Sequence, residues 1–238
     1  MTLFWIILIV SVASLIKGIS GFGFALVSLP PLLIWYSPAE IIPVLVICNF
    51  ISSTIIILQK KDKNLVPPKV KPLIVTGAVF TLLGVLILKN ANEEHLIHII
   101  SMIFIALTGL SFFISKSPVN YPGVTYPIVG AVVGLLTGST SVSGPPLTIF
   151  LNSAKINNQE FREIFSWFNI TTSIVAIIGY FIADLITMES LKLVLLFFPL
   201  IYIGTYIGKR LNNKIPSNIF KNSTLVLTLI SCVFLLFK

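Results

Sequence analysis

The sequence predicts an all-α polytopic membrane protein made of two inverted repeats, each a broken or re-entrant helical hairpin followed by three transmembrane helices. Three features carry this prediction: the composition, a glycine- and proline-rich break in each half, and the charges of the loops. Hydrophobic residues make up 56% of the 238 residues and charged residues 10%, against roughly 25% charged residues in soluble domains. With a mean hydropathy of +1.02, the chain has more apolar surface than a water-soluble core of this size can bury, so several helices must face lipid.

The first repeat is predicted over residues 1–117. A hairpin over residues 3–36 opens it and is broken around Gly18–Gly23. Its first two apolar elements are shorter than the roughly 20 residues of a span, so the hairpin is expected to dip into the membrane or to cross it at a strong tilt. The five elements of this repeat are Leu3–Ile16, Phe22–Tyr36, Ile41–Leu58, Pro72–Leu88 and Leu96–Ile114.

The second repeat, over residues 118–238, has the same order of elements. Its hairpin over residues 126–151 is broken around Gly138–Gly144, and Pro145-Pro146-Leu147 follows as Pro30-Pro31-Leu32 follows the first break. Asn169 is followed by the hydroxyl residues Thr172 and Ser173, as Asn49 is followed by Ser52 and Ser53. Matches that recur in the same order indicate an internal duplication. The five elements are Tyr126–Thr137, Pro145–Leu151, Ile164–Ala183, Leu191–Ile207 and Ile219–Phe237.

Loop charges give the two repeats opposite orientations. Cytoplasmic loops carry an excess of lysine and arginine, as loops 59–71 and 208–221 do, whereas loop 89–95 carries two glutamates and suits the outside. The span over residues 41–58 is then expected to run inward and its counterpart over residues 164–183 to run outward. The lysines and arginines that give the net charge of +8 lie between the spans, where they indicate the orientation of the chain. The lipid bilayer is therefore the expected partner, and nucleic acid is not.

Each break places polar groups where irregular backbone is tolerated only if it is buried in protein or lines a cavity. The helix that follows a break aims unpaired N–H groups into that space, and Pro145-Pro146 is well suited to begin such a helix. Hydroxyl groups together with helix N-termini suit a small oxyanion. Close helix packing is the alternative for the Gly134/Gly138 and Gly204/Gly208 pairs. The candidate binding residues at the breaks are Ser20, Gly21, Gly23, Ser139, Thr140, Ser141, Ser143, Gly144 and Pro145.

Three further polar residues are candidates for the same site. Lys17 lies beside the first break, where it is expected either to serve as the charge partner of an anion or to snorkel to the interface. Asn49 and Asn169 lie in mid-span, and ligand contact and interhelical hydrogen bonding are both open for them. No cofactor or metal site is predicted. An enzyme is not expected either, because a serine hydrolase needs a base within reach at depth, and the two histidines, His95 and His98, lie at a span entrance.

The two breaks resemble those of the TauE/SafE sulfite-exporter family of membrane transporters. The resemblance rests on Gly18-Ile-Ser-Gly21-Phe-Gly23 with Pro30 and on Gly134 through Ser143-Gly144-Pro145-Pro146. It implies movement of small sulfur-containing or organic anions, such as sulfite or sulfonates, often as export. It also implies a pore-lining role for Gly21, Gly23, Ser141, Ser143, Gly144 and Pro145.

These expectations describe a secondary transporter in the plasma membrane that moves a small anion by alternating access at a midplane site between the two breaks. An anion channel with the same site chemistry is the alternative. The sequence leaves open the coupling ion, the direction of transport and whether copies of the chain form a homo-oligomer.

Overall fold

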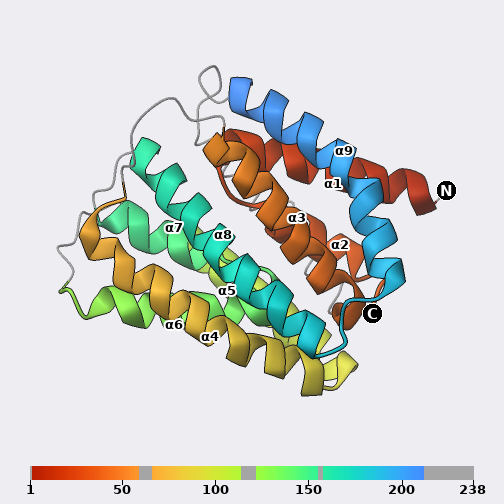
Figure 1. The fold of residues 1–238 in the computed structure, drawn as a ribbon, viewed down its shortest axis with the longest axis horizontal. Helices are drawn as coiled ribbons and strands as arrows, with labels where there is room; N and C mark the ends of the chain where they lie inside the picture. Colours follow the sequence, from red (N-terminus) through yellow and green to blue (C-terminus); the bar gives the residue numbers. More distant parts are fainter. Residues whose placement is uncertain (1, 59–65, 114–121, 155–157, 212–238) are drawn as a thin grey trace.

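The structure describes residues 2–58, 66–113, 122–154 and 158–211. These residues form nine α-helices and one short 3-10 helix, with no strand among them (Figure 1). The structure is a computed structural model. The predicted all-α class is confirmed, while the predicted span 219–237 lies outside the described residues. The helices are α1 (Thr2–Ser20), α2 (Phe24–Leu32), α3 (Pro38–Leu58), η1 (Pro68–Val70), α4 (Lys71–Asn90), α5 (Glu93–Phe113), α6 (Thr125–Thr140), α7 (Gly144–Ser153), α8 (Asn158–Ile182) and α9 (Met188–Leu211).

Within the described residues, five helical segments are long and apolar enough to cross a membrane. Large apolar side chains also point outward from α4 and α9, among them Val79, Leu86, Leu195 and Tyr202. Such surface is unfavourable in water and suits contact with lipid tails. The chain is therefore a membrane protein. The five segments are Thr2–Ser20, Pro38–Leu58, Pro68–Asn90, Glu160–Ile182 and Met188–Leu211.

The first helix of each hairpin is longer than predicted. It continues to Ser20 in α1 and to Thr140 in α6, whereas the apolar pattern ended at Ile16 and Thr137. Gly18, which was expected to open the first break, lies within α1 and allows close packing: a Cβ on Gly18 would lie 2.6 Å from the carbonyl oxygen of Thr205 in α9. At 19 residues, α1 is long enough to span, so the expectation that both elements of this hairpin are short is wrong for its first helix.

Each break is consequently only three residues long, at Gly21–Gly23 and Ser141–Ser143. Both breaks begin at a residue with left-handed backbone, with φ of 85° at Gly21 and 61° at Ser141. A left-handed residue directly after the last turn is a common way to end a helix. Glycine adopts this conformation without strain, whereas a serine there is uncommon in a protein chain.

Packing between the two halves is reciprocal. The first helix of each half packs on a helix of the other half, α1 on α9 and α6 on α4. The third α-helices of the two halves, α3 and α8, pack on each other. Small residues allow the close approach: a Cβ on Gly134 would lie 2.1 Å from the carbonyl oxygen of Gly77, and one on Gly208 would lie 2.4 Å from that of Leu15. The packing interpretation of the Gly134/Gly138 and Gly204/Gly208 pairs is thus confirmed.

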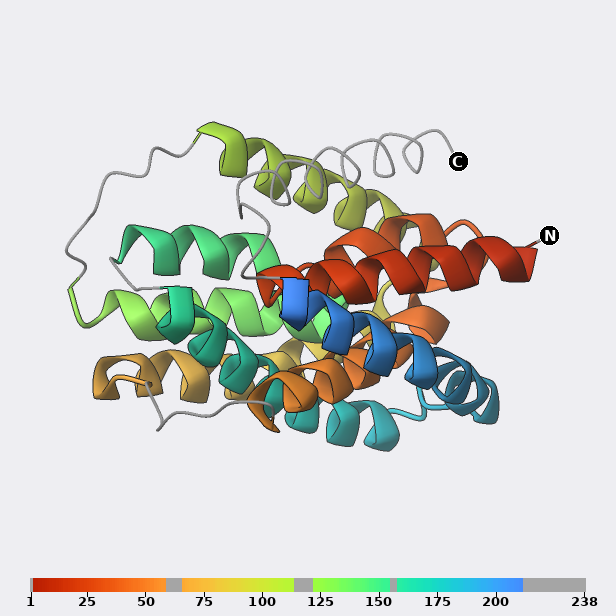
Figure 2. The same cartoon turned by 90° about the horizontal axis from the view of Figure 1, so that it is seen from above.

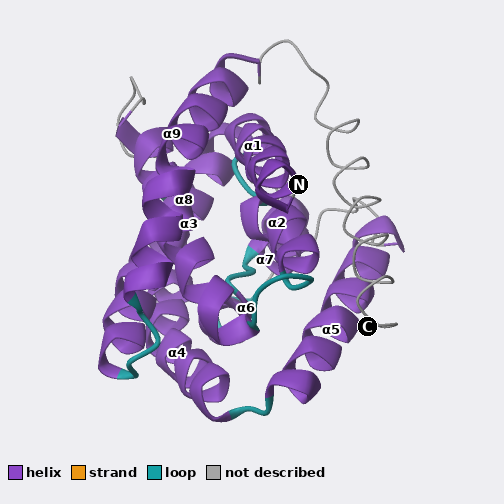
Figure 3. Ribbon diagram, turned by 90° about the vertical axis from the view of Figure 1, so that its right-hand side faces the viewer, coloured by secondary structure: helices purple, strands orange, loops and turns teal. Residues whose placement is uncertain are grey.

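Counterpart helices of the two halves run in opposite directions. In Figures 1 and 2, α1 runs from right to left and α6 from left to right, and Figure 1 shows the same opposition for α3 and α8. The helices lie roughly along one axis, and α5 lies at the edge of the bundle (Figure 3). The two breaks therefore enter the bundle along antiparallel paths.

Replacing Gly134 with alanine is expected to destabilise the protein by about 1–3 kcal/mol, because the new methyl group overlaps the backbone of α4 and forces the two helices apart. Gly109→Ala is the matched control: a Cβ at this helical glycine has nothing within 4 Å, and alanine favours a helix interior by roughly 1 kcal/mol. Thermal unfolding in detergent should show a lower midpoint for Gly134→Ala only. Equal midpoints would contradict the close contact of α4 with α6.

Candidate functional site

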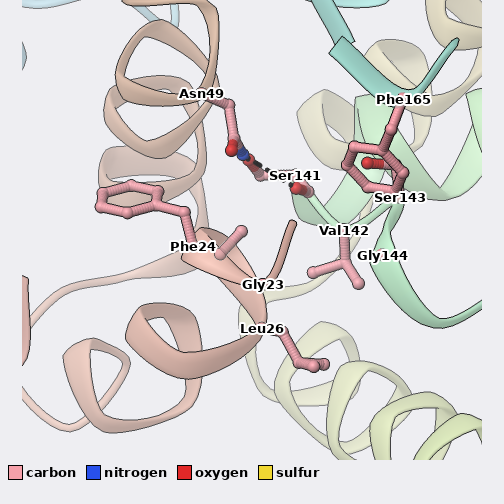
Figure 4. Close-up of a pocket in the computed structure, with 10 residues that line it drawn as sticks. Gly23, Phe24, Leu26, Asn49, Ser141, Val142, Ser143, Gly144 and Phe165 are labelled. Atoms are coloured by element: carbon pink, nitrogen blue, oxygen red, sulfur yellow. Dashed lines mark hydrogen bonds between the residues drawn. The ribbon is translucent and has the colours of Figure 1, made fainter. Parts of the chain in front are cut away.

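The two breaks meet at one cavity, although more than a hundred residues of chain separate them. One wall consists of the start of α2, the opposite wall consists of the second break, and α3 and α8 contribute one side chain each (Figure 4). The cavity volume is about 10 Å³, which is about the space that one water molecule needs. An anion of the size of sulfite therefore requires the two breaks to move apart. The lining residues are Gly23, Phe24, Ala25, Leu26, Asn49, Ser141, Val142, Ser143, Gly144 and Phe165.

Of the candidate residues, the structure brings five to the cavity wall: Gly23, Asn49, Ser141, Ser143 and Gly144. Two others, Lys17 and Asn169, lie behind the wall, where each is hydrogen-bonded to a lining residue.

The remaining five candidates are not among the lining residues. Because α6 extends further than predicted, the hydroxyl groups of Ser139 and Thr140 donate to carbonyl oxygens of their own helix, at 2.9 Å and 2.7 Å. Ser20 bonds locally within the first break, to carbonyl oxygens of Ile16 and Phe22. Gly21 packs against the side chain of Arg162, and Pro145 lies in the first turn of α7. Of the four hydroxyl candidates around the second break, Ser141 and Ser143 line the cavity in this conformation, and Ser139 and Thr140 do not.

A chain of hydrogen bonds leads from Lys17 to the cavity. Lys17 Nζ donates to Asn49 Oδ1 at 2.6 Å and to the Asn49 carbonyl oxygen at 3.2 Å. Asn49 Nδ2 donates in turn to Ser141 Oγ at 3.0 Å and to the Ser141 carbonyl oxygen at 3.3 Å. All three side chains are buried, with exposed fractions of 1%, 6% and 1%. The chain joins α1, α3 and the second break.

This chain has a fixed polarity. The lysine amine only donates here, so Asn49 must present its oxygen to Lys17 and its N–H groups to Ser141. Ser141 Oγ accepts from Asn49 and belongs to a residue that lines the cavity, so its own hydrogen is available to a ligand there. Lys17 pairs with no carboxylate among the described residues. A buried lysine without an acidic partner and a hydroxyl donor at the cavity wall both favour an anionic ligand.

Asn169, in the second half, contacts the same break without a charged residue behind it. Ser143 Oγ donates to Asn169 Oδ1 at 2.9 Å, as Ser141 pairs with Asn49. The position four residues before the second break, which corresponds to Lys17, holds Thr137, whose hydroxyl donates to the carbonyl of Val133 in its own helix. Of the two asparagine contacts with the second break, only the one through Asn49 leads on to a lysine.

Backbone donors are also unequal between the two breaks. At the start of α2, the N–H of Val27 donates to the carbonyl oxygen of Gly23 at 3.1 Å. The N–H groups of Phe24 and Ala25 come before this bond and belong to the donors that a helix leaves unpaired at its start. The prediction that Pro145-Pro146 begins α7 is confirmed. Since prolines have no N–H, the first turn of α7 offers fewer backbone donors than the first turn of α2.

Two functional candidates were missed by the sequence reading, Phe165 and Arg162. Phe165 lines the cavity, and Arg162 reaches the carbonyls at the end of α1. Both lie on α8, which begins at Asn158, whereas the predicted span began at Ile164. That boundary placed Arg162 in a loop. The signal that could have found it is the apolar residue pattern around Phe161, Ile164 and Phe165, which continues helically through the charged positions.

Comparison with known proteins identifies the family of the chain. The family model described as "Sulfite exporter TauE/SafE" matches residues 6–235, a range that includes both breaks and every candidate residue. No match was found among curated proteins or among solved structures. Because the match extends over nearly the whole chain, the chain belongs to the TauE/SafE sulfite exporter family of membrane transporters.

Proposed function

We propose that this protein is a multi-pass secondary transporter of the plasma membrane that exports small anions, with sulfite and related organosulfur acids as substrates. The observation that carries the proposal is the chain from Lys17 through Asn49 to Ser141, which ends at the cavity between the two breaks. An anion there would accept hydrogen bonds from Ser141 and from the start of α2. Its charge would also stabilise the ammonium form of Lys17.

Alternating access is supported by the way the two halves pack. Residues 1–117 and 118–238 act as two inverted repeats in this proposal, with the substrate held between them near the midplane. The reciprocal contacts of α1 with α9 and of α6 with α4, together with their opposite directions, are what such repeats require. The small cavity then corresponds to a closed state, and rocking of one repeat against the other opens it to either side.

Uptake into liposomes tests the proposal and separates it from an anion channel. Purified protein would be reconstituted and offered sulfite, sulfate, thiosulfate and sulfoacetate. A transporter should show saturable uptake that is accelerated by unlabelled substrate inside, whereas a channel shows no such acceleration. Absence of flux for every anion in the panel would contradict the function.

Ser141→Ala is expected to lower kcat/KM for uptake by roughly 10- to 100-fold, because a hydrogen bond to a charged ligand contributes about 1.5–3 kcal/mol. Ser143→Ala should have a smaller effect, since the Ser143 hydroxyl already donates to Asn169. Ser139→Ala is the matched control: this serine is two residues from Ser141 but bonds within its own helix. Equal uptake by the Ser139 and Ser141 variants would contradict the site.

A further inference from the structure

The start of α8 holds the first break through Arg162. Its guanidinium donates from Nη2 to the Gly18 carbonyl at 2.9 Å and from Nη1 to the Ile19 carbonyl at 3.2 Å. These carbonyls lie in the last turn of α1, where a helix has no backbone donor for them. Arg162 comes from the second half of the chain, so the two bonds connect the halves across the break.

Aromatic packing reinforces this connection. The ring of Phe22, in the middle of the first break, lies 6.0 Å from the ring of Phe161 and 5.7 Å from that of Phe165. On its other side, Phe22 is close to the second break, because a Cβ on Gly144 would lie 3.3 Å from Phe22 Cδ2. Since Phe165 also lines the cavity, these rings and Arg162 connect the first break to the cavity wall on the side where α8 begins. We call Arg162, Phe22, Phe161 and Phe165 the α8 clamp.

The charge of Arg162 has only neutral partners in this state. Its bonds go to two backbone carbonyls, and it pairs with no carboxylate in the described part of the chain. Lys209, in the last turn of α9, is close enough to act on Arg162 as a like charge. A guanidinium binds an oxyanion with two parallel, charge-assisted hydrogen bonds, which are about twice as strong as bonds between neutral groups. An entering anion is therefore a better partner for Arg162 than the two carbonyls.

The corresponding position in the other half has no such group. In the second half, Phe161, Arg162 and Phe165 precede Asn169 on α8. At the same spacings before Asn49, the first half has Ile41, Ile42 and Leu45. These three residues are fully buried and belong to the same apolar cluster as Val142 of the second break. Closure on that side is aliphatic and uncharged, so an anion can compete for the closing contacts on one side only.

We propose that Arg162 is an anion-responsive latch: it holds the first break closed through Gly18 and Ile19, and an anion that arrives from the side where α8 begins takes over its guanidinium and opens the α8 clamp. This inference rests on the proposed function, because the transported anion is the one that opens the latch. Arg162 is then a specificity-determining residue at the entrance, outside the cavity itself.

Thiol labelling of Ile19→Cys tests the latch, because Ile19 is 2% exposed and its carbonyl is one of the latched groups. The protein is reconstituted with Cys48 and Cys232 replaced by alanine and treated with a membrane-impermeant thiol reagent. Sulfoacetate serves as the anion, since sulfite itself consumes such reagents. We expect slow labelling that sulfoacetate accelerates. With Arg162→Gln we expect labelling at least roughly 10-fold faster without anion, from the loss of charge-assisted bonds, and no further acceleration.

Matched variants separate the possible outcomes. Arg210→Gln removes an arginine at the end of α9 whose contact in the described part of the chain is with Tyr206 of the same helix, and this variant should label as the wild type does. If Arg162→Gln does not fold, Arg162→Lys carries the test and should label faster than wild type, because a lysine lacks the two-pronged contact. Labelling that neither sulfoacetate nor the Arg162 substitution changes would overturn the latch. If wild-type protein takes up sulfoacetate in that case, the proposed function stands without it.

Discussion

Replacing Asn49 with aspartate is expected to abolish anion transport while the fold remains stable. The new carboxylate would lie where Asn49 Oδ1 now accepts from Lys17 at 2.6 Å, forming an ion pair with the amine and placing a negative charge at the cavity wall. Repulsion between like charges about 4 Å apart costs about 4 kcal/mol at an effective dielectric constant near 20. Sulfoacetate uptake should therefore fall by roughly 100- to 1000-fold.

Asn169→Asp is the control for stability in that experiment. It places the same carboxylate at the corresponding position of the second half, where Thr137 stands in place of the lysine and the amide oxygen accepts from Ser143 instead of from an amine. An unpaired buried charge destabilises by several kcal/mol. We expect a lowered unfolding temperature in detergent for Asn169→Asp and an unchanged or raised one for Asn49→Asp. Transport by Asn49→Asp near the wild-type rate would contradict the role of the lysine as the charge of the site.

Lys17→Met is expected to have the second-largest effect, a loss of transport of roughly 100-fold or more. Methionine fills similar space without the charge, and removing a buried charge also removes its desolvation cost. The cost to stability should be limited to about 1–3 kcal/mol, because Asn49 Oδ1 loses its donor. Uptake assays and thermal unfolding of the same preparation measure the two effects separately.

Lys192→Met is the matched control, because Lys192 is exposed near the start of α9 and far along the sequence from either break. It should transport as the wild type does. If Lys17→Met also transported at the wild-type rate, Lys17 would be a structural residue, and the anion would have to be bound by the hydroxyl and N–H groups alone.

The sequence predicts the helices well because hydropathy and span length determine most of them. It misplaces the ends of α1 and α6 because glycine in a membrane helix has two uses. Gly18 lies within α1 and provides contact with α9, whereas Gly21, three residues later, has the positive φ that ends the helix. Glycine spacing alone does not separate close packing from chain reversal.

The composition of the site is partly predictable, and its connections are not. Lys17 and Ser141 are recognisable as polar residues in apolar surroundings, but the link through Asn49 joins residues 32 and 92 positions apart. Which two of the four serines and threonines of the second break face the cavity depends on where α6 ends. Arg162 is recognisable only if α8 is extended through its charged first turns.

Protection of Ser141→Cys by substrate tests most directly whether the anion occupies the cavity between the two breaks. The variant, with Cys48 and Cys232 replaced by alanine, would be treated with a small thiol reagent at increasing sulfoacetate concentrations. Occupancy of the cavity predicts a labelling rate that falls with sulfoacetate and reaches a plateau at saturation, and a Ser139→Cys control that shows no such fall. A Ser141→Cys labelling rate independent of sulfoacetate, in protein that transports the anion, would contradict the site.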